Sequence, residues 1–527
     1  MSISKFNREE TGLFTSISNQ ISYDQINLSQ FINQPFSKEA FEKQIIEKEK
    51  SFSESKRKIL YDVLSENYKN IPTSEETSKN INLLLEKNTF TVTTGHQLSI
   101  FTGPVYFIYK ILHTIRLANE LKELYPTSDF VPVFWMASED HDFEEIQSVN
   151  LFGKNLKWNT EQKGPVGRFD MSSFENVKNE FKEFFENNPE SEVLNSLEFY
   201  SGKTLSKATF NLINQIFKKY GLIIIDGDNS ILKKEFSTII EQELETQFSY
   251  TEVLETNKIL QEENIKLQIT PREINLFYVE NNLRSRIQLH EKGYFIEEKG
   301  IFSKNELFDL LEKSPEYFSP NVVLRPLYQE TILPNLCYLG GGGEIAYWLQ
   351  LKRVFNKTNT TFPLIQVRNS FLFIDNGTRK KLDKLNLTMT DLFNSTEELK
   401  KKYVLLNSSE ELNFNNIDNS FKEFCNIITK QINQVDLNLK SYGEAEISRL
   451  EKQLISIKQK LIKTEKNKHE ASLNQIEQIK NKLFPNGGLQ ERTMNFFSLC
   501  SDGNIENHLN EIYSAIDTFG NDLIVIS

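Results

Sequence analysis

The stretch FTVTTGHQLSIFTGPVYFIYKILHTIRLANELKEL at residues 90–124, followed by FVPVFWMAS at 130–138, decides the fold. Its first five residues are β-branched or aromatic and stop at Gly95, which is typical of a short strand. Residues 130–138 are almost continuously apolar, as expected of a strand buried on both faces. The segment after Pro104 has a helical pattern, with one apolar stripe formed by Val105, Ile108, Ile111, Ile115 and Ala118. The order strand, helix, strand predicts a parallel β-α-β unit.

Later segments extend this unit into an α/β core. A helical pattern near residues 203–219 leads into GLIIID (221–226), an apolar strand that ends in acidic residues. NLCYLGGGGEIAYWLQLKRVF (335–355) repeats the order of strand, glycines and helix, and FPLIQVRNSFLFI (362–374) closes the core. The fold class we predict is α/β, built on a parallel sheet.

The chain divides into four segments by composition. Residues 1–85 are polar and rich in helix formers, and we expect helices that pack on the core. Residues 86–378 contain the core, with a looser excursion at about 150–200. Residues 379–484 are rich in Lys, Glu, Asn and Gln without a convincing strand, and residues 485–527 end in DLIVIS, a strand that would return to the main body.

Heptad spacing predicts a long α-helical coiled coil in residues 379–484. Apolar residues recur at intervals of three and four: Phe421, Phe424, Ile428, Ile432, Val435, Leu439, Ile447, Leu450, Leu454, Ile457, Leu461, Leu473, Ile476, Ile479 and Leu483. Such a seam fits an antiparallel hairpin within one chain, and it equally fits an arm that pairs two chains. The spacing does not separate the two, and we expect a homodimer formed through the coiled coil.

Composition disfavours several classes of partner. The formal net charge is −12, from 61 Lys and Arg against 73 Asp and Glu, which disfavours nucleic acid. No apolar run approaches the roughly 20 residues of a membrane helix, and the start MSISKFNREETGLF lacks the pattern of a signal peptide. Cys337, Cys425 and Cys500 lie far apart, without a CxxC pair. We expect a cytoplasmic protein with reduced thiols and no membrane or nucleic-acid partner.

Polar and glycine-rich loops follow the predicted strands. In open parallel sheets ligands bind beyond the carboxyl ends of the strands, where loops converge. The residues at these positions are Gly95, His96 and Gln97; Glu139, Asp140, His141 and Asp142; Asp226 and Asp228; and Gly340, Gly341, Gly342 and Gly343 with Glu344. Four such loops at one edge of a sheet would form a site for small molecules.

Each loop also has a purely structural interpretation. His96 could be a satisfied structural histidine, residues 139–142 a solvated acidic loop or helix cap, and Asp226 and Asp228 a cap for the next helix. Four glycines allow close backbone approach to phosphate or carboxylate, yet they also suit a flexible turn and match neither GxGxxG nor GxxxxGK[ST]. The cluster at 139–142 favours function, because four ionisable groups directly after an apolar strand are costly to bury.

A metal site is a separate hypothesis. His96, Asp140, His141 and Asp142 are acceptable zinc ligands, and a thiol-bearing substrate would suit zinc. The sequence contains neither HExxH nor CxxC. We therefore expect no metal.

Four blocks of sequence resemble one family: TGHQLSIFTGPVYFIYK (94–110), PVFWMASEDHDFEEI (132–146), VVLRPLYQETILPNLCYLGGGGEIAYWLQLKRVF (322–355) and FPNGGLQERTMNF (484–496). They are similar to the bacillithiol-synthesis cysteine-adding enzymes, the cysteine ligases. The resemblance implies a Rossmann-like core related to class I aminoacyl-tRNA synthetases, a dimerising coiled coil and two connecting-peptide insertions, at about 150–200 and about 250–320. It also places Gly95-His96-Gln97 where a synthetase carries its HIGH signature, although the chain has no KMSKS counterpart.

The activity implied by the resemblance is ligation of cysteine to glucosaminyl-malate through an amide bond, which gives bacillithiol. Carboxyl activation would use a nucleotide, ATP or ADP. His96, Asp140 and His141 would be catalytic, with His96 and the start of the helix after Pro104 steadying phosphates and Asp140 or His141 orienting or deprotonating the amine. Binding residues would be Gly95, Gln97, Gly103, Glu139, Asp142, Arg325, Gly340, Gly341, Gly342, Gly343, Glu344 and Tyr347.

Arg325 would bind the malate carboxylates, and Glu344 would bind the ammonium group of cysteine, because in each case the charges are opposite. Two other interpretations stay open. One is a different carboxylate-amine ligase or a nucleotidyltransferase on the same core. The other is a coiled-coil assembly protein without catalytic activity.

Overall fold

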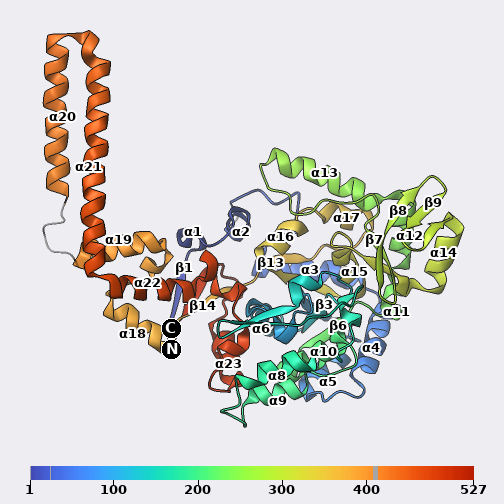
Figure 1. Cartoon of the computed structure of the whole chain (residues 1–527). Coiled ribbons are helices and arrows are strands. Elements are labelled where there is room, and N and C mark those ends of the chain that lie inside the picture. The colour runs from blue at the N-terminus through green and yellow to red at the C-terminus, as the bar shows by residue number, and fades with distance from the viewer. Residues whose placement is uncertain (1, 24, 408–413) are drawn as a thin grey trace.

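A five-stranded parallel sheet forms the centre of the molecule (Figure 1). The computed structural model describes residues 2–23, 25–407 and 414–527. The strands lie in the order β13 (Leu364–Val367), β12 (Asn335–Gly340), β2 (Thr89–His96), β3 (Asp129–Met136) and β6 (Ile223–Asp226). All neighbouring pairs are parallel. The predicted α/β class and its Rossmann-like core are confirmed.

Strand register brings the predicted loops to one edge of this sheet. His96 is paired with Met136, and Met136 in turn with Asp226. On the other side Leu339 is level with Thr94, and Gly340 with Val367. The carboxyl ends of the strands are therefore aligned within a residue or two, so the loops that follow them meet.

The helix α6 (Tyr106–Leu124) is more deeply buried than its predicted stripe required. The stripe is buried, but so are Tyr109, Lys110 and His113 on other faces. The reason is that a second segment packs on the helix from the side away from the sheet: the centre of the Phe371 ring lies 4.7 Å from that of Tyr109. The helix is enclosed between the sheet and this segment, and its polar residues need buried partners.

The remaining helices around the sheet come from both ends of the core. Those before β2 are α1 (Arg8–Thr11), α2 (Ser16–Ser22), α3 (Lys38–Ser51), α4 (Glu54–Tyr68) and α5 (Glu75–Leu83). Those that follow the core strands are α7 (Phe143–Ile146), α10 (Leu205–Phe217), α11 (Ser230–Lys234), α16 (Gly342–Trp348) and α17 (Lys352–Lys357). No helix in the described ranges is both long and apolar enough to cross a membrane.

Two excursions leave the core. The first contains β4 (Ser148–Leu151), β5 (Lys154–Lys157), α8 (Glu175–Glu183) and α9 (Glu192–Glu198). The second contains α12 (Ser237–Thr246), α13 (Phe248–Glu262), β7 (Leu276–Glu280), β8 (Leu283–His290), β9 (Gly293–Ile296), β10 (Gly300–Phe302), α14 (Lys304–Lys313), β11 (Phe318–Pro320) and α15 (Arg325–Ile332). Its five strands form a separate antiparallel sheet in the order β10-β9-β8-β7-β11.

The two chain ends meet in a third sheet (Figure 1). β15 (Leu523–Ile526) lies between β1 (Ile3–Phe6), to which it is antiparallel, and β14 (Ser370–Phe373), to which it is parallel. The expectation that residues 362–374 close the core is therefore correct only for β13, because β14 leaves the parallel sheet. The expectation of helices alone before residue 85 also missed β1.

A helical hairpin projects from the body as a long arm (Figure 1). It consists of α20 (Asn415–Val435) and α21 (Lys440–Lys468), and its base is joined to α18 (Asn376–Lys384), α19 (Thr396–Asn407) and α22 (Glu470–Leu483). The last helix of the chain is α23 (Ile505–Ala515), which packs on α6. The predicted coiled coil is confirmed, and its two longest helices pair within the chain.

Candidate functional site

A cavity of about 900 Å³ opens at the carboxyl edge of the parallel sheet. Most residues predicted for the site line it: Gly95, His96, Gln97, Glu139, Asp140, His141, Arg325, Gly341, Gly342, Gly343, Glu344 and Tyr347. They come from the end of β2 and the residue after it, from the loop after β3, from Gly341 and α16 after β12, and from the start of α15. Four segments that are distant in sequence therefore face one space.

Three predicted residues do not line this cavity: Gly103, Asp142 and Gly340. Asp142 instead caps α7 by accepting a hydrogen bond from the Glu145 amide at 3.4 Å. Gly340 is the buried last residue of β12, and its carbonyl accepts from the Arg368 amide at 2.8 Å. Gly103 lies in a turn with positive φ, where its carbonyl accepts from the Asn495 side chain.

Glu344 and Lys110 form an ion pair at the base of the cavity. The Lys110 Nζ lies 2.5 Å from Glu344 Oε2 and donates a second hydrogen bond to the Gly95 carbonyl at 2.9 Å. The Gly341 amide also donates to Glu344 Oε2, at 2.7 Å. Burial alone would raise the pKa of Glu344, but Lys110 and the Gly341 amide hold it below its usual value. Glu344 is therefore ionised at neutral pH.

His96 is neutral at physiological pH. Burial, with the nearby positive charge of Lys110, lowers its pKa to about 4. Its Nδ1 lies 2.8 Å from the Gln97 carbonyl, which only accepts, so Nδ1 carries the proton and Nε2 accepts from the Tyr106 hydroxyl at 3.2 Å. The positive charge that we expected His96 to offer to phosphates is absent.

Three backbone amides at the start of α6 already donate hydrogen bonds within the protein. The Val105 amide donates to the Met494 carbonyl at 2.7 Å, and the Phe107 and Ile108 amides donate to carbonyls of the preceding turn. Anion binding at a helix start depends on amides without a protein partner, and these three amides already have one. Phosphate binding by the start of α6 stays a prediction.

Asp140 is held at the rim by several donors. Gln97 Nε2 donates to Asp140 Oδ2 at 2.7 Å, and the His141 amide donates to Oδ1 at 2.7 Å. Burial opposes the charge, but these hydrogen bonds, together with His141 and Arg284, hold the pKa of Asp140 well below its usual value. A carboxylate with so low a pKa is a weak proton acceptor and a good partner for a cation.

The antiparallel sheet supplies a wall of arginines on the opposite side. Arg284 donates from Nη1 to His141 Nδ1 at 2.8 Å, and its guanidinium lies 3.7 Å from the centre of the Phe277 ring. Its Nε is buried without a hydrogen-bond partner among the described residues. Arg272 and Arg286 line the same cavity. Cation–π contact and burial fix Arg284 in place while its neighbours stay accessible.

The cavity is rich in positive charge although the protein is acidic. Seven cationic side chains line it: Lys110, Arg272, Arg284, Arg286, Arg325, Arg368 and Arg492. Four carboxylates oppose them, namely Glu139, Asp140, Glu145 and Glu344. A local excess of cations in a chain with net charge −12 indicates a site for anionic ligands that also carry a cationic or amino group.

Several cavity residues were missed in the sequence. Lys110 and Tyr106 lie on α6, whose pattern indicates packing, and Arg284 lies in a strand without a recognisable motif. Of these residues, only Lys110 could have been recognised from the sequence pattern. A single charged residue within the apolar run VYFIYKILHTI must be buried, and a buried lysine needs a charged partner.

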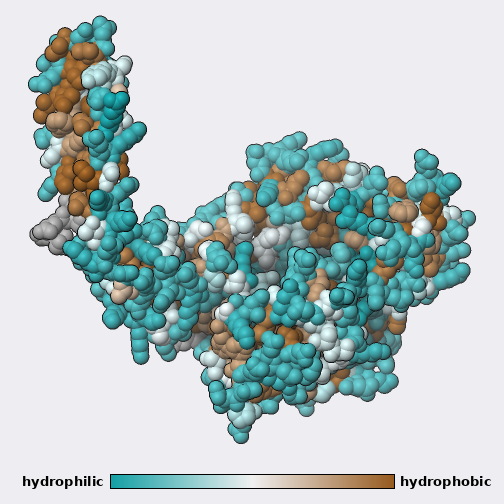
Figure 2. Space-filling view, viewed as in Figure 1, coloured by the Kyte–Doolittle hydropathy of each residue, from teal (hydrophilic) through white to brown (hydrophobic). Residues whose placement is uncertain are grey.

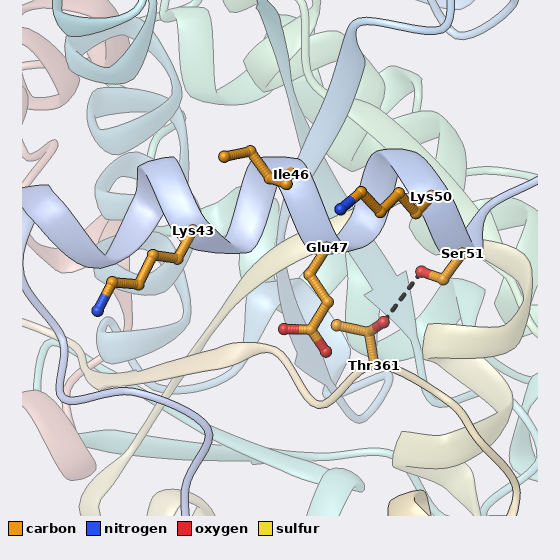
Figure 3. Close-up of a pocket in the computed structure, with 6 residues that line it drawn as sticks. All are labelled: Lys43, Ile46, Glu47, Lys50, Ser51 and Thr361. Carbon is orange, nitrogen blue, oxygen red and sulfur yellow. Dashed lines mark hydrogen bonds between the residues drawn. The ribbon is translucent and has the colours of Figure 1, made fainter.

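A smaller pocket beside α3, of about 490 Å³, lacks this concentration of charge. Figure 3 shows the residues that line it, among them Ser51 and Thr361, whose hydroxyl groups are 2.9 Å apart and form a hydrogen bond. None of the predicted site residues lies there. Within the described ranges no group of three or more His, Cys, Asp or Glu side chains is arranged to hold a metal ion.

Fold and cavity together define an α/β protein with a charged small-molecule site and a coiled-coil arm. Two family models cover the chain: "Bacillithiol biosynthesis BshC, N-terminal Rossmann-like domain" matches residues 1–369, and "Bacillithiol biosynthesis BshC, C-terminal coiled-coil domain" matches residues 371–527. The chain belongs to the BshC family of bacillithiol biosynthesis, and it is an enzyme of the ligase class.

Curated relatives agree with this assignment. The proteins named "Putative cysteine ligase BshC" from Flavobacterium johnsoniae and Flavobacterium psychrophilum are each 43% identical to the chain. The alignment covers 86% of both chains for the first, and 93% of this chain and 92% of the relative for the second. The protein of the same name from Christiangramia forsetii is 39% identical over 92% of each chain.

Proposed function

We propose that the protein joins the carboxyl group of cysteine to the amino group of glucosaminyl-malate, the last step of bacillithiol synthesis. The observation that carries this proposal is the meeting of ionised carboxylates and a larger number of cations in one cavity. Both substrates combine carboxylate with amino groups, so a site that holds them needs partners of both signs. Membership of the BshC family and the names of the relatives support the same reaction. We place this chemistry in the cytoplasm.

Amide formation from a free carboxylate requires activation. We infer that ATP or ADP provides it: the cysteine carboxylate attacks a phosphorus atom and displaces diphosphate or the shortened nucleotide. The amine then attacks the acyl carbon and loses a proton, and the leaving group is AMP from an acyl-adenylate or inorganic phosphate from an acyl-phosphate. Arg325 and Arg368 stay charged at all physiological pH values and line the cavity, which suits phosphate groups.

The geometry supports separate binding roles for the carboxylates and for the arginines of the cavity. Asp140 and Glu344 stay ionised, so they suit the ammonium group of cysteine or the amino group of the acceptor better than they suit proton removal. Arg284 and Arg286 of β8, with Arg272 from the segment before β7, line the same cavity and suit the two carboxylates of malate. The substrates would then meet between the two sheets.

The test is reconstitution with the purified full-length protein. Bacillithiol formation from cysteine, glucosaminyl-malate and either ATP or ADP would be followed by mass spectrometry for wild type, His96→Ala, Asp140→Asn and Glu344→Gln. We expect the two carboxylate variants to lose about 100-fold or more, since each leaves cationic partners unmatched in a buried site. Glu255→Gln, on the exposed face of α13, serves as the matched control.

Two outcomes would contradict the proposal, and they are distinct. Near-normal turnover in all three site variants would refute the site while leaving the reaction standing. Wild-type protein that makes no bacillithiol with either nucleotide would refute the reaction, and binding of nucleotide under those conditions would favour a different carboxylate-amine ligase.

We further propose that the arm forms a homodimer. Large apolar side chains remain exposed along α20 and α21 after the hairpin has formed, and Figure 2 shows hydrophobic residues gathered on the arm. Ile427 is 57% exposed and Ile457 is 58% exposed. Apolar residues that the hairpin does not bury are suited to contact with a second copy of the arm.

Light scattering after size exclusion would test the dimer. The double variant Ile427→Glu with Ile457→Glu should elute as a monomer of about half the wild-type mass, because it places charges on the exposed apolar face that the two copies would share. Lys430→Glu, a charge change on the exposed face of α20, should leave the mass unchanged. A wild type that is monomeric at micromolar concentration would contradict the dimer.

A further inference from the structure

The C-terminal segment LQERTMNFF (489–497) approaches the cavity and is not used by the function above. Its first anchor is the strand β14. The Phe373 amide donates to Gln490 Oε1 at 3.1 Å, and the Phe371 amide donates to Glu491 Oε2 at 3.0 Å. Gln490 and Glu491 thereby act as substitutes for a neighbouring strand, which fixes the backbone of this segment against the third sheet.

Its second anchor is the turn that leads into α6. Asn495 Nδ2 donates to the carbonyls of Phe101 at 2.7 Å and Gly103 at 2.6 Å, and the Val105 amide donates to the Met494 carbonyl at 2.7 Å. Asn495 is fully buried. The segment is therefore held before and after Arg492, and the short 3-10 turn Gln490–Arg492, which contains the first anchor, has a defined position.

Arg492 lies between these anchors and extends into the cavity. Its side chain is exposed, and no hydrogen bond or ion pair joins its guanidinium to a residue in the described parts of the chain. It also lines a second cavity of about 460 Å³, together with Arg368 and the glycines 341–343. Arg492 and the glycine loop therefore stand at the border between the two cavities.

The charge of Arg492 is not compensated by its sequence neighbour. Glu491 is buried and paired with Arg368, whose Nη2 donates to its Oε1 at 2.7 Å. Lys110 is likewise matched by Glu344. An arginine on a fixed backbone turn, at the edge of a cation-rich cavity and without a protein acceptor, has the properties of a residue that binds an oxyanion.

We propose that Arg492 binds an oxyanion of a substrate, either a carboxylate or a phosphate, at the border between the two cavities. The C-terminal segment thereby completes a site whose other residues belong to the Rossmann-like part of the chain. The identity of the substrates rests on the proposed function, but the binding of an oxyanion by Arg492 does not. A carboxylate would come from malate, and a phosphate from the nucleotide.

Calorimetric titration with L-malate and with inorganic diphosphate would test this. Both probes would be titrated into full-length wild type, Arg492→Ala, Arg492→Lys and Arg449→Ala, the last of which removes an exposed arginine of the arm, 74% accessible, as a charge-matched control. We expect Arg492→Ala to raise the dissociation constant of at least one probe about tenfold or more, since a charge-assisted hydrogen bond is lost. Arg492→Lys should restore part of the affinity, and Arg449→Ala should bind as the wild type does.

The probe whose affinity falls in Arg492→Ala identifies the source of the oxyanion. A loss of affinity for both probes supports one position shared by carboxylate and phosphate. Because Arg492 is exposed, its loss should leave the thermal midpoint unchanged, which separates a binding role from a structural one. Wild type that binds neither probe, or Arg492→Ala that binds both as the wild type does, would overturn the proposal. If Arg492→Ala loses affinity for a probe but the wild type makes no bacillithiol, the proposed function alone is refuted.

Discussion

At the scale of single residues, Lys110 has the clearest effect to be predicted. Replacing Lys110 by Met leaves Glu344 and the Gly95 carbonyl without their cationic donor. We expect a loss of about 3 kcal/mol in the free energy of unfolding and a rise in the pKa of Glu344, so that activity falls at the acidic end of its pH range. Denaturant unfolding and a pH–rate profile would measure the two effects.

Lys122→Met on the same helix is the control for this substitution, because Lys122 is 47% exposed and its pair with Asp129 lies at the surface. It should cost less than about 1 kcal/mol. Equal losses in the two variants, or an unchanged acidic limb in Lys110→Met, would show that the pair does not set the charge of Glu344.

A second residue-scale prediction concerns His113, which is buried in α6. It accepts from the Asn369 amide at Nδ1, 3.1 Å, and donates from Nε2 to the Thr518 carbonyl, 3.3 Å. Burial lowers its pKa to about 4, so below pH 6.5 the unfolded chain binds a proton that the folded chain excludes. The stability that depends on neutral His113 is complete above pH 6.5 and is lost as the pH falls toward 4.

The slope of the unfolding free energy between pH 6 and 5 would measure this effect. It should be steeper in wild type than in His113→Gln by about 1.4 kcal/mol per pH unit. His290→Gln, an exposed histidine of β8, should keep the wild-type slope. Identical slopes for His113→Gln and wild type would contradict the assignment.

The sequence predicted the site residues at the strand ends better than the others. His96 ends β2, and Asp140 and Glu344 lie in the segments that follow β3 and β12, so the parallel order of the sheet was enough to bring them together. Arg284 and Lys110 reach the cavity through tertiary packing, from an antiparallel strand and from a helix interior. No local pattern distinguishes such residues, because their position depends on which distant segments cover them.

At the scale of elements, the turn before α6 carries its own prediction. Phe101, Thr102 and Gly103 all have positive φ, and a Cβ on Gly103 would lie 2.5 Å from that of Ser99. Gly103→Ala should therefore combine backbone strain with a clash and destabilise the protein by more than about 2 kcal/mol. Chemical denaturation would measure it.

Gly12→Ala is the control for this substitution. Gly12 also has a positive φ, but its ψ of 11° places it in the left-handed helical region, whereas the ψ of −146° at Gly103 is open almost only to glycine. No atom lies within 4 Å of a Cβ added at Gly12. Gly12→Ala should cost about 1 kcal/mol, and equal losses in the two variants would contradict the special requirement for glycine at position 103.

Elements also show where prediction from sequence stops. The heptads of α20 and α21 predicted helices correctly but left open whether they pair within the chain, since the same seam serves both arrangements. The strand β1 was missed because ISKF carries only a weak alternation, and its pairing with β15 joins residues more than 500 positions apart. Pairing of that range cannot be read from local periodicity.

At the scale of the whole molecule, the two family domains form one interlocked body below the arm. Glu491, from the C-terminal domain, is buried and paired with Arg368 of the N-terminal domain, and Phe371 and Asn495 cover α6 and the turn before it. Removing Glu491 leaves the buried Arg368 guanidinium without its carboxylate, which costs about 3–5 kcal/mol. The damage should spread across the domain boundary.

All three tryptophans, Trp135, Trp158 and Trp348, lie in the N-terminal domain, so their fluorescence reports on that domain alone. In Glu491→Ala the thermal midpoint measured by tryptophan fluorescence should fall together with the midpoint measured by circular dichroism. Arg449→Ala on the arm should shift neither. If the substitution lowered only the circular dichroism midpoint, the Rossmann-like part would be shown to fold independently of the segment that carries Arg492, and the site would not require both domains.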